Sequence, residues 1–147
     1  MTKKILVLGS GAREHSIIKA IDRSSKPNEI FCIASNINPG IANLCKEFII
    51  DDFNNPEIVT KYATEKNISL AIIGPENPLQ KGIANALWNA KIKVVGPKKE
   101  LAQIETSKAF TRNLLKKHKI PGGPKYKTFN SVVGLSLIHI SEPTRPY

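Results

Sequence analysis

The chain has 147 residues, of which 41% are hydrophobic and 23% charged, a composition that suits one globular domain and the start of a second. It contains no run of about 18 apolar residues, which excludes a membrane-spanning helix. The four or five apolar residues before Gly9 are too few for the core of a signal peptide. We therefore expect a cytoplasmic protein that does not act at a membrane.

The net charge of +10 is distributed unevenly along the chain. Residues 1–104 carry 14 basic and 10 acidic side chains, whereas residues 105–147 carry 8 basic and 2 acidic ones. No aromatic platform or recognition motif accompanies the basic part, so we do not expect a nucleic-acid partner. Ligands with several phosphates, or an acidic remainder of the chain, would explain the charge equally well. The two cysteines, Cys32 and Cys45, lack metal-ligand spacing and are expected to be buried thiols.

The first element is a glycine-rich turn between a strand and a helix. The aliphatic run 5–8 predicts a buried parallel strand, Gly9-Ser10-Gly11 follows it, and a helix is expected over 13–24. Such a turn directs unpaired N–H groups and the positive end of the helix dipole at one spot, which favours an anion. Arg13 would add a planar set of donors suited to phosphate. The alternative is a tight turn that binds nothing.

Further strands are predicted at residues 29–34, 47–50, 69–74 and 93–97, with helices between them. Asn55 and Pro56 begin one helix, and residues 79–90 form another whose Ile83, Leu87 and Trp88 face inward. The alternation predicts an α/β fold, a Rossmann-like doubly wound and mostly parallel sheet. Its ligand edge would collect the loops Gly9–His15, Ser35–Gly40 and Gly74–Leu79.

The pattern changes after Lys98. Helices are expected over 99–105 and 107–118, a hinge over 121–124, a short strand at Lys125–Phe129 and a helix cap at Asn130. We therefore divide the chain into an α/β domain over residues 1–104 and the incomplete start of a second domain over residues 105–134.

A dinucleotide-binding oxidoreductase that uses NAD(P) is the main alternative. Its fingerprint requires a third glycine where this chain has Glu14, and an acidic residue after the second strand, where Ser35 and Asn36 stand instead. A carboxylate beside a pyrophosphate would repel it, although Glu14 could avoid this by turning toward solvent or a substrate amine. These residues argue against the dinucleotide.

Three motifs in order carry a family resemblance: Gly9–His15, Gly74–Leu79 and Thr106–Phe110. With Val95-Gly96-Pro97 and His118–Pro121, they resemble the phosphoribosylamine–glycine ligase family of ATP-grasp ligases, over about residues 4–133. The resemblance implies ATP-dependent joining of glycine to 5-phosphoribosylamine, which gives glycinamide ribonucleotide, ADP and phosphate in purine biosynthesis. It further implies an acyl phosphate formed on glycine, with Mg²⁺ or Mn²⁺ assisting.

The resemblance also assigns site residues. Around the ribose phosphate or the amine it places Gly9, Gly11, Arg13, Glu14 and His15, and along the same edge Pro39, Gly40, Gly74, Pro75, Glu76 and Pro78. Lys108 would reach the phosphates of ATP at the start of the ATP-grasp portion. As alternatives, Arg13 and His15 are ordinary surface residues of a helix, Glu76 caps a helix, and Lys108 is a solvated lysine.

The chain also departs from the family pattern. Residues 35–41 differ from the commoner Pro-Gly-Asn-x-Gly-Thr loop. The glycine-rich phosphate loop, metal-binding carboxylates and adenine contacts of an ATP-grasp domain do not appear in the sequence, and we assign no catalytic residue. Residues 135–147 resemble translated sequencing-adaptor read-through, so we expect a non-native tail whose His139 and Arg145 have no function. The chain by itself is expected to be inactive.

Overall fold

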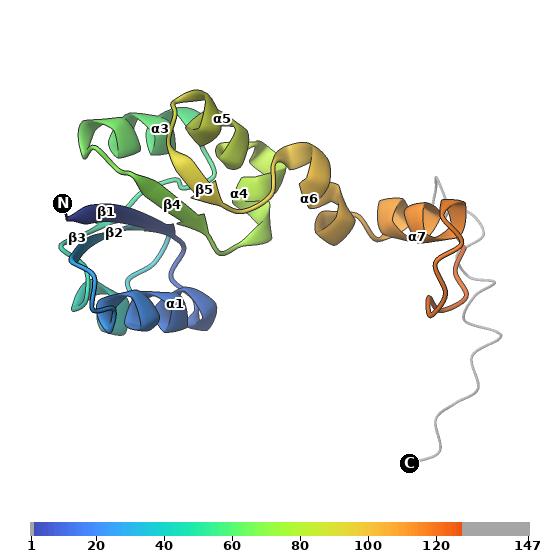
Figure 1. Ribbon diagram of the computed structural model, residues 1–147, viewed down its shortest axis with the longest axis horizontal. Helices are drawn as coiled ribbons and strands as arrows, with labels where there is room; N and C mark the ends of the chain where they lie inside the picture. Colours follow the sequence, from blue (N-terminus) through green and yellow to red (C-terminus); the bar gives the residue numbers. More distant parts are fainter. Residues whose placement is uncertain (1, 128–147) are drawn as a thin grey trace, which may run out of the picture. The chain divides into compact units, whose positions relative to one another are not determined.

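A computed structural model of the chain describes residues 2–127 of the 147, and it divides into two units between Thr106 and Ser107 (Figure 1). In residues 125–127 no strand forms, so the first part of the strand expected at 125–129 is absent. Phe129, the expected cap Asn130, the end of the second domain and the tail 135–147 lie outside the described residues.

The first unit is built on a five-stranded parallel sheet in the order β3-β2-β1-β4-β5. The chain adds strands on one side of β1 and then, after β3, crosses to the other side. The order in which strands are added to the sheet therefore reverses between β1 and β4, and such folds bind ligands at this point of reversal. This confirms the predicted doubly wound α/β fold. The strands are β1 (Lys3–Leu8), β2 (Asn28–Ala34), β3 (Glu47–Ile50), β4 (Leu70–Ile73) and β5 (Lys93–Val95).

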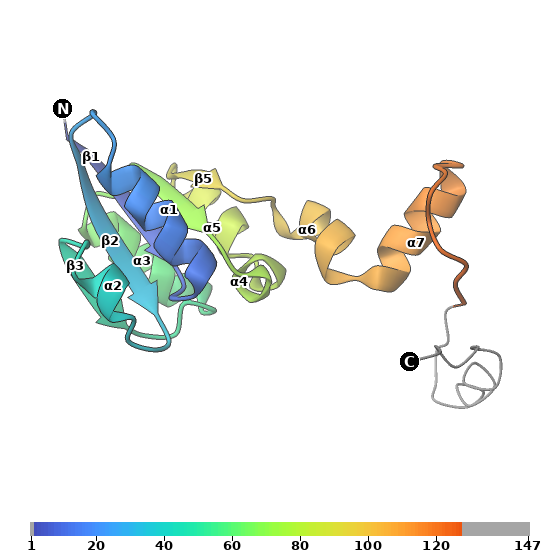
Figure 2. The ribbon, with the colours of Figure 1, turned by 90° about the horizontal axis from the view of Figure 1, so that it is seen from below.

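Helices cover the two faces of this sheet, and Figures 1 and 2 show α1 and α3 on opposite faces. Alternate side chains of β1 point into the two layers of core, one on each face of the sheet. Val7 packs with Ile18 of α1 and Ile41 of α2, whereas Leu6 and Leu8 pack in the layer of α3 and α5. The helices of this unit are α1 (Ala12–Asp22), α2 (Pro39–Ala42), α3 (Pro56–Glu65), α4 (Glu76–Lys81), α5 (Ile83–Asn89) and α6 (Lys99–Thr106).

The single helix predicted over 79–90 is two helices. It begins earlier than expected, at Glu76, and it breaks at Gly82, whose φ of 84° is left-handed. This residue ends α4 and precedes α5, a conformation that glycine adopts without steric cost. Trp88, expected to face inward, is 42% exposed, while Ile83 and Leu87 are buried as predicted.

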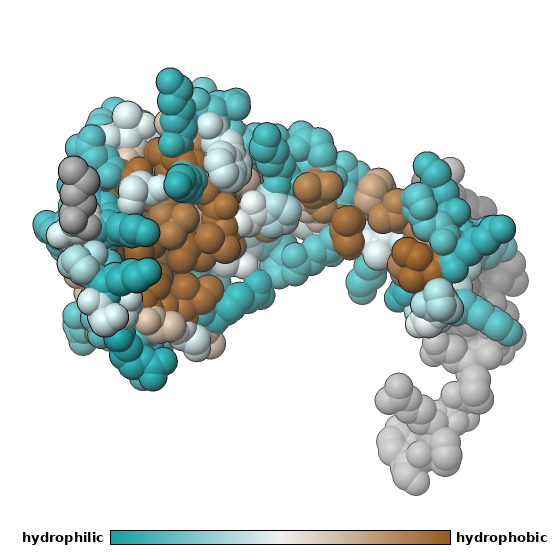
Figure 3. All heavy atoms as spheres, in the orientation of Figure 1, coloured by the Kyte–Doolittle hydropathy of each residue, from teal (hydrophilic) through white to brown (hydrophobic). Residues whose placement is uncertain are grey.

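The α1 side of β4 and β5 is left without a covering helix among the described residues. Val95 of β5 is 55% exposed there, and Leu70 and Ile72 of β4 are only half-buried. A groove of about 430 Å³ between α1 and β1 continues this surface, lined by Ile5, Ile17, Ile21 and Leu70 among others. Figure 3 shows apolar side chains gathered over this part of the sheet.

The second unit begins with α7 (Lys108–Lys117), which is capped by Ser107. The Ser107 hydroxyl accepts a hydrogen bond from Phe110 N at 3.3 Å. None of the residues of α7 is buried. The Tyr126 hydroxyl donates to Arg112 O at 3.0 Å, which holds the segment after the hinge against this helix. Across residues 2–127, no helix is long and apolar enough to cross a membrane.

Candidate functional site

Three loops meet at the carboxyl edge of the sheet because they follow the adjacent parallel strands β1, β2 and β4. We call them the β1 loop (residues 9–11), the β2 loop (residues 35–38) and the β4 loop (residues 74–75). Gly9 has a φ of 108°, and a Cβ placed on it would lie 2.9 Å from Cγ of Pro75. Gly9 is therefore required twice, by its own backbone and by the approach of the β4 loop.

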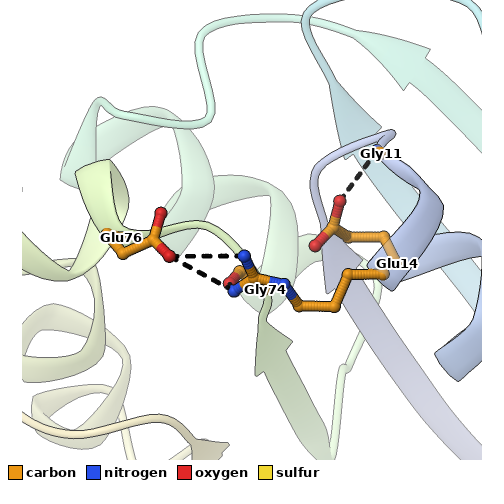
Figure 4. A network of polar contacts seen from close by, with 5 residues as sticks. Gly11, Glu14, Gly74 and Glu76 are labelled. Carbon is orange, nitrogen blue, oxygen red and sulfur yellow. Dashed lines mark hydrogen bonds and ion pairs between the residues drawn. The ribbon is translucent and has the colours of Figure 1, made fainter. Parts of the chain in front are cut away.

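Glu14 is the one buried charged residue among the residues described, with 5% of its surface exposed. It lies in the first turn of α1, and its Oε2 accepts a hydrogen bond of 2.7 Å from Gly11 N. Figure 4 shows this carboxylate between Gly11 and Gly74. The alternative in which Glu14 turns toward solvent is therefore wrong, and the helix N-terminus and the Gly11 N–H stabilise the carboxylate between the loops.

Arg13 points from α1 to the β4 loop. Its Nη1 donates to Gly74 O at 2.7 Å, and its Nη2 lies 3.3 Å from Oε1 of Glu76. The Arg13 side chain is 60% exposed and that of Glu76 42%. The guanidinium thus stands at the predicted edge, but two of its donors are already engaged within the protein.

Glu76 occupies the first position of α4, after Pro75 as N-cap. A hydrogen bond to its own backbone N–H and then the Arg13 guanidinium lower the pKa of the Glu76 carboxyl. Its interaction with the helix start agrees with the capping alternative, and its contact with Arg13 places it in the site as well. Pro78, by contrast, is fully buried within α4 and supports the loop from behind.

The β2 loop is joined to the β1 loop through Asn38, a residue that the sequence reasoning did not single out. Its Nδ2 donates to Ser10 O at 2.9 Å, while its Oδ1 accepts from Gly40 N at 3.1 Å and from Ile41 N at 3.4 Å. Pro39 follows as the first residue of α2. Asn38-Pro39 has the same pattern as Asn55-Pro56, which predicts a helix start, so this pattern is the sequence signal that identifies Asn38.

His15 lies against the start of α2. A Cβ placed on Gly40 would lie 2.5 Å from Cε1 and 2.7 Å from Nε2 of His15, so the imidazole rests directly on the glycine. The side chain is half-buried. His15 and Gly40 are therefore in contact on the side of the site that faces β2, and Pro39 precedes Gly40 at the start of α2.

Cys32 lies beneath the β1 loop. Its thiol is buried in β2 and donates a hydrogen bond of 3.4 Å to Gly9 O. Cys45 is half-buried rather than buried, and both cysteines are free thiols. Cys32 thus supports the backbone of the β1 loop from the core.

Lys108 belongs to the second unit. It is exposed and borders a groove of about 390 Å³ that Arg112 and Lys125 also line. This concentration of positive charge suits an anionic ligand such as a phosphate chain. Over residues 2–127, no group of three or more His, Cys, Asp or Glu side chains could hold a metal ion.

The arrangement in the first unit is suited to one phosphorylated ligand. The N–H groups of Ala12 and Arg13 have no intrahelical acceptor, since they lie in the first turn of α1, and the Arg13 side chain lies beside them. At the end of β2, the exposed Ser35 and Asn36 provide no carboxylate for the ribose of a dinucleotide.

Comparisons with known proteins identify the family of the chain. A family described as "Phosphoribosylglycinamide synthetase, N domain" matches residues 3–105. A curated relative named phosphoribosylamine–glycine ligase, from Methanosarcina barkeri, is 46% identical over 126 residues, which are 86% of this chain and 29% of the relative. The relative of that name from Methanosphaera stadtmanae is 45% identical over 86% of this chain and 28% of its own length. The chain thus spans less than a third of these proteins.

Solved structures share the fold. Phosphoribosylglycinamide synthetase from Anaerococcus prevotii superposes with a TM-score of 0.64 at 21% identity, over 81% of this chain and 30% of that one. N5-carboxyaminoimidazole ribonucleotide synthetase from Thermotoga maritima gives 0.70 at 19% identity, over 95% of this chain and 36% of that one. The resemblance seen in the motifs is confirmed, and the oxidoreductase alternative has no support. The chain belongs to the phosphoribosylglycinamide synthetase family, of which it contains the N domain.

Proposed function

We propose that this chain is the N-terminal part of a cytoplasmic ligase that joins glycine to 5-phosphoribosylamine at the expense of ATP. The product would be glycinamide ribonucleotide, with ADP and phosphate released, in purine biosynthesis. The part played by this chain is to bind the phosphoribosylamine. The observation that carries the proposal is the family match over residues 3–105, which spans all three loops at the ligand edge of the sheet.

The sugar phosphate is proposed to bind at the start of α1. Free N–H groups of the first helical turn and the guanidinium of Arg13 would receive the phosphate oxygens. A phosphate dianion would take the place of the Glu76 carboxylate at Arg13, while the bond from Arg13 to Gly74 O holds the guanidinium in position. The proposed site residues are Gly9, Gly11, Arg13, Glu14, His15, Pro39, Gly40, Gly74, Pro75, Glu76 and Pro78.

ATP and a divalent cation, Mg²⁺ or Mn²⁺, belong to the proposed reaction of the whole enzyme. Lys108 with Arg112 and Lys125 fits the phosphates of ATP by charge, and ATP would supply the phosphoryl group that activates the glycine carboxylate. The part of the chain that the structure describes supplies no set of metal ligands. We accordingly expect the 147-residue chain to form no ADP by itself.

Calorimetry with ribose 5-phosphate tests the phosphate site directly. The chain should bind this probe, and Arg13→Ala should weaken binding about tenfold or more, as expected for a charge-assisted bidentate contact. Arg23→Ala is the matched control, because Arg23 follows the other end of the same helix, where its Nε donates to Lys19 O. If both variants lost the same affinity for ribose 5-phosphate, the loss would be an effect of net charge alone, and the proposed site would be rejected.

A chimera tests the reaction. Residues 1–105 would replace the corresponding part of the Methanosarcina barkeri relative, and ADP formation would be measured with glycine and phosphoribosylamine present or omitted singly. We expect activity that requires both substrates and is lost in the Arg13→Ala chimera but not in the Arg23→Ala chimera. A folded chimera that forms no ADP would contradict the proposed function.

A further inference from the structure

Glu14 has an unusual position for a residue of a ligand site. Removing a carboxylate from water is costly unless it is paired, yet Glu14 is 5% exposed, and its carboxylate accepts a hydrogen bond from a backbone N–H group. A residue that binds an incoming amine must present its oxygens to it. The burial of Glu14 therefore calls for another explanation.

Three glycines from two loops surround this one side chain. A Cβ on Gly74 would lie 2.0 Å from Oε1 of Glu14, and a Cβ on Gly11 would lie 2.8 Å from Oε2. A Cβ on Gly9 would lie 3.1 Å from both Cγ and Cδ of Glu14. All three glycines are therefore in contact with one carboxyl group.

The glycine at position 74 is explained by this contact and not by its backbone. Unlike Gly9, neither Gly74 nor Gly11 has a φ in the left-handed region, so an L-residue is conformationally allowed at both positions. What excludes a side chain at Gly74 is Glu14, whose Cγ and Cδ also lie within 2.8 Å of the added Cβ. The β4 loop thus rests on the side chain of Glu14.

We propose that Glu14 is a positioning residue: its buried carboxylate sets the separation of the β1 and β4 loops, and it does not bind the substrate amine. This inference rests on the proposed function, since the ligand is the phosphoribosylamine assigned there. Glu14 occupies the Gly11 N–H and leaves the amides of Ala12 and Arg13 to the phosphate. It also fixes Gly74, whose carbonyl oxygen holds the Arg13 guanidinium.

The first test is a double-mutant cycle read by thermal unfolding and by ribose 5-phosphate binding. Gly74→Ala should lower the melting temperature by about 5 °C or more and weaken binding about tenfold, since its Cβ displaces Glu14. In the Glu14→Ala background, the same substitution should cost less than half as much in both measurements. Gly74→Ala in a His15→Ala background is the matched control and should show no such relief, because the atoms nearest to a Cβ at Gly74 belong to Glu14, whereas His15 lies against Gly40.

Should Gly74→Ala not fold, the cycle is run with Glu14→Asp, whose side chain is one methylene shorter and withdraws from position 74. Gly74→Ala should then fold in the Glu14→Asp background and not in the His15→Ala background. Equal effects of Gly74→Ala in all backgrounds would overturn the proposal.

The second test separates positioning from direct binding of the amine. Two probes are compared, ribose 5-phosphate and a carbocyclic analogue of phosphoribosylamine that carries the amine. A positioning residue predicts that Glu14→Gln and Glu14→Ala change the affinities for both probes by the same factor. A loss confined to the probe with the amine would overturn the inference. If the wild-type chain binds neither probe, the proposed function fails, while the unfolding cycle still decides whether Glu14 sets the position of Gly74.

Discussion

The β1 loop is held to its two neighbours in different ways. Toward the β4 loop, steric contacts add to the hydrogen bond from Arg13 to Gly74 O: Pro75 lies against Gly9, and the buried Glu14 lies against Gly74. Toward the β2 loop, one amide hydrogen bond from Asn38 and the half-buried ring of His15 make the junction. A buried contact leaves no room to adjust, whereas a hydrogen bond and a partly exposed ring can shift. We call the contacts between the β1 and β4 loops the β4 side of the site, and those between the β1 and β2 loops the β2 side. The β4 side therefore fixes the shape of the site, whereas the β2 side can adjust.

This difference predicts that substitutions on the β4 side cost more. The largest effect is expected for Gly9→Ala, which combines a φ of 108° with a Cβ 2.9 Å from Pro75. We expect the free energy of unfolding in urea to fall by about 2–4 kcal/mol. Ribose 5-phosphate binding should be lost as well, because the β1 loop is displaced.

Gly82→Ala is the matched control for Gly9→Ala. Its φ of 84° is also left-handed, but the nearest atom to its Cβ is Cδ of Lys99, at 3.9 Å. Backbone strain alone should cost it about 1–2 kcal/mol. Equal losses at Gly9 and Gly82 would show that contact with Pro75 adds nothing, and the contrast between the two sides would not hold.

Two Asn-Pro helix starts allow the β2 side to be measured. Asn38→Ala and Asn55→Ala each remove an N-cap whose Oδ1 accepts two backbone hydrogen bonds, at a cost of about 1 kcal/mol. Only Asn38 also donates to Ser10 O, in the β1 loop. Calorimetry should therefore show weaker ribose 5-phosphate binding for Asn38→Ala and unchanged binding for Asn55→Ala. If ribose 5-phosphate binding were unchanged in both variants, the β2 loop would not be part of the binding site.

A smaller effect is expected for Gly40→Ala. Its Cβ meets the end of the His15 ring, which can rotate toward solvent, so the loss should be about 0.5–1.5 kcal/mol, the cost of a displaced rotamer. In a His15→Ala background, the same substitution should be neutral or slightly stabilising, since alanine is favoured over glycine in a helix. If Gly40→Ala lowered the free energy of unfolding more than Gly9→Ala does, the β2 side would be the more rigid of the two, contrary to the prediction.

Much of this arrangement follows from sequence pattern, and what does not follow has a physical reason. The aliphatic runs and the Asn55-Pro56 start predicted the strands and α3, because periodicity and capping are local properties. The break at Gly82 was missed because the apolar spacing continues through it, and the exposure of Trp88 depends on what packs beside α5. The burial of Glu14 could not be predicted, since it depends on Gly74, 60 positions away in the sequence.

The smallest effect, and the one that separates the two sides by pH, concerns Glu76. In the folded chain, its own backbone N–H and then Arg13 lower the pKa of the Glu76 carboxyl from 4.5. The stability that Glu76 contributes is therefore complete above about pH 4.5, and it is lost as the pH falls through the lower pKa of the folded state. The pair is exposed, so Glu76→Gln should lower the melting temperature only slightly at neutral pH and not at all in acid. The loss caused by Asn38→Ala should remain constant over the same range, because the Asn38 amide does not titrate. The test is to measure the melting temperatures of both variants and of the wild type from neutral to acid pH. A Glu76→Gln difference that persists in acid would mean that its charge does not contribute to the β4 side.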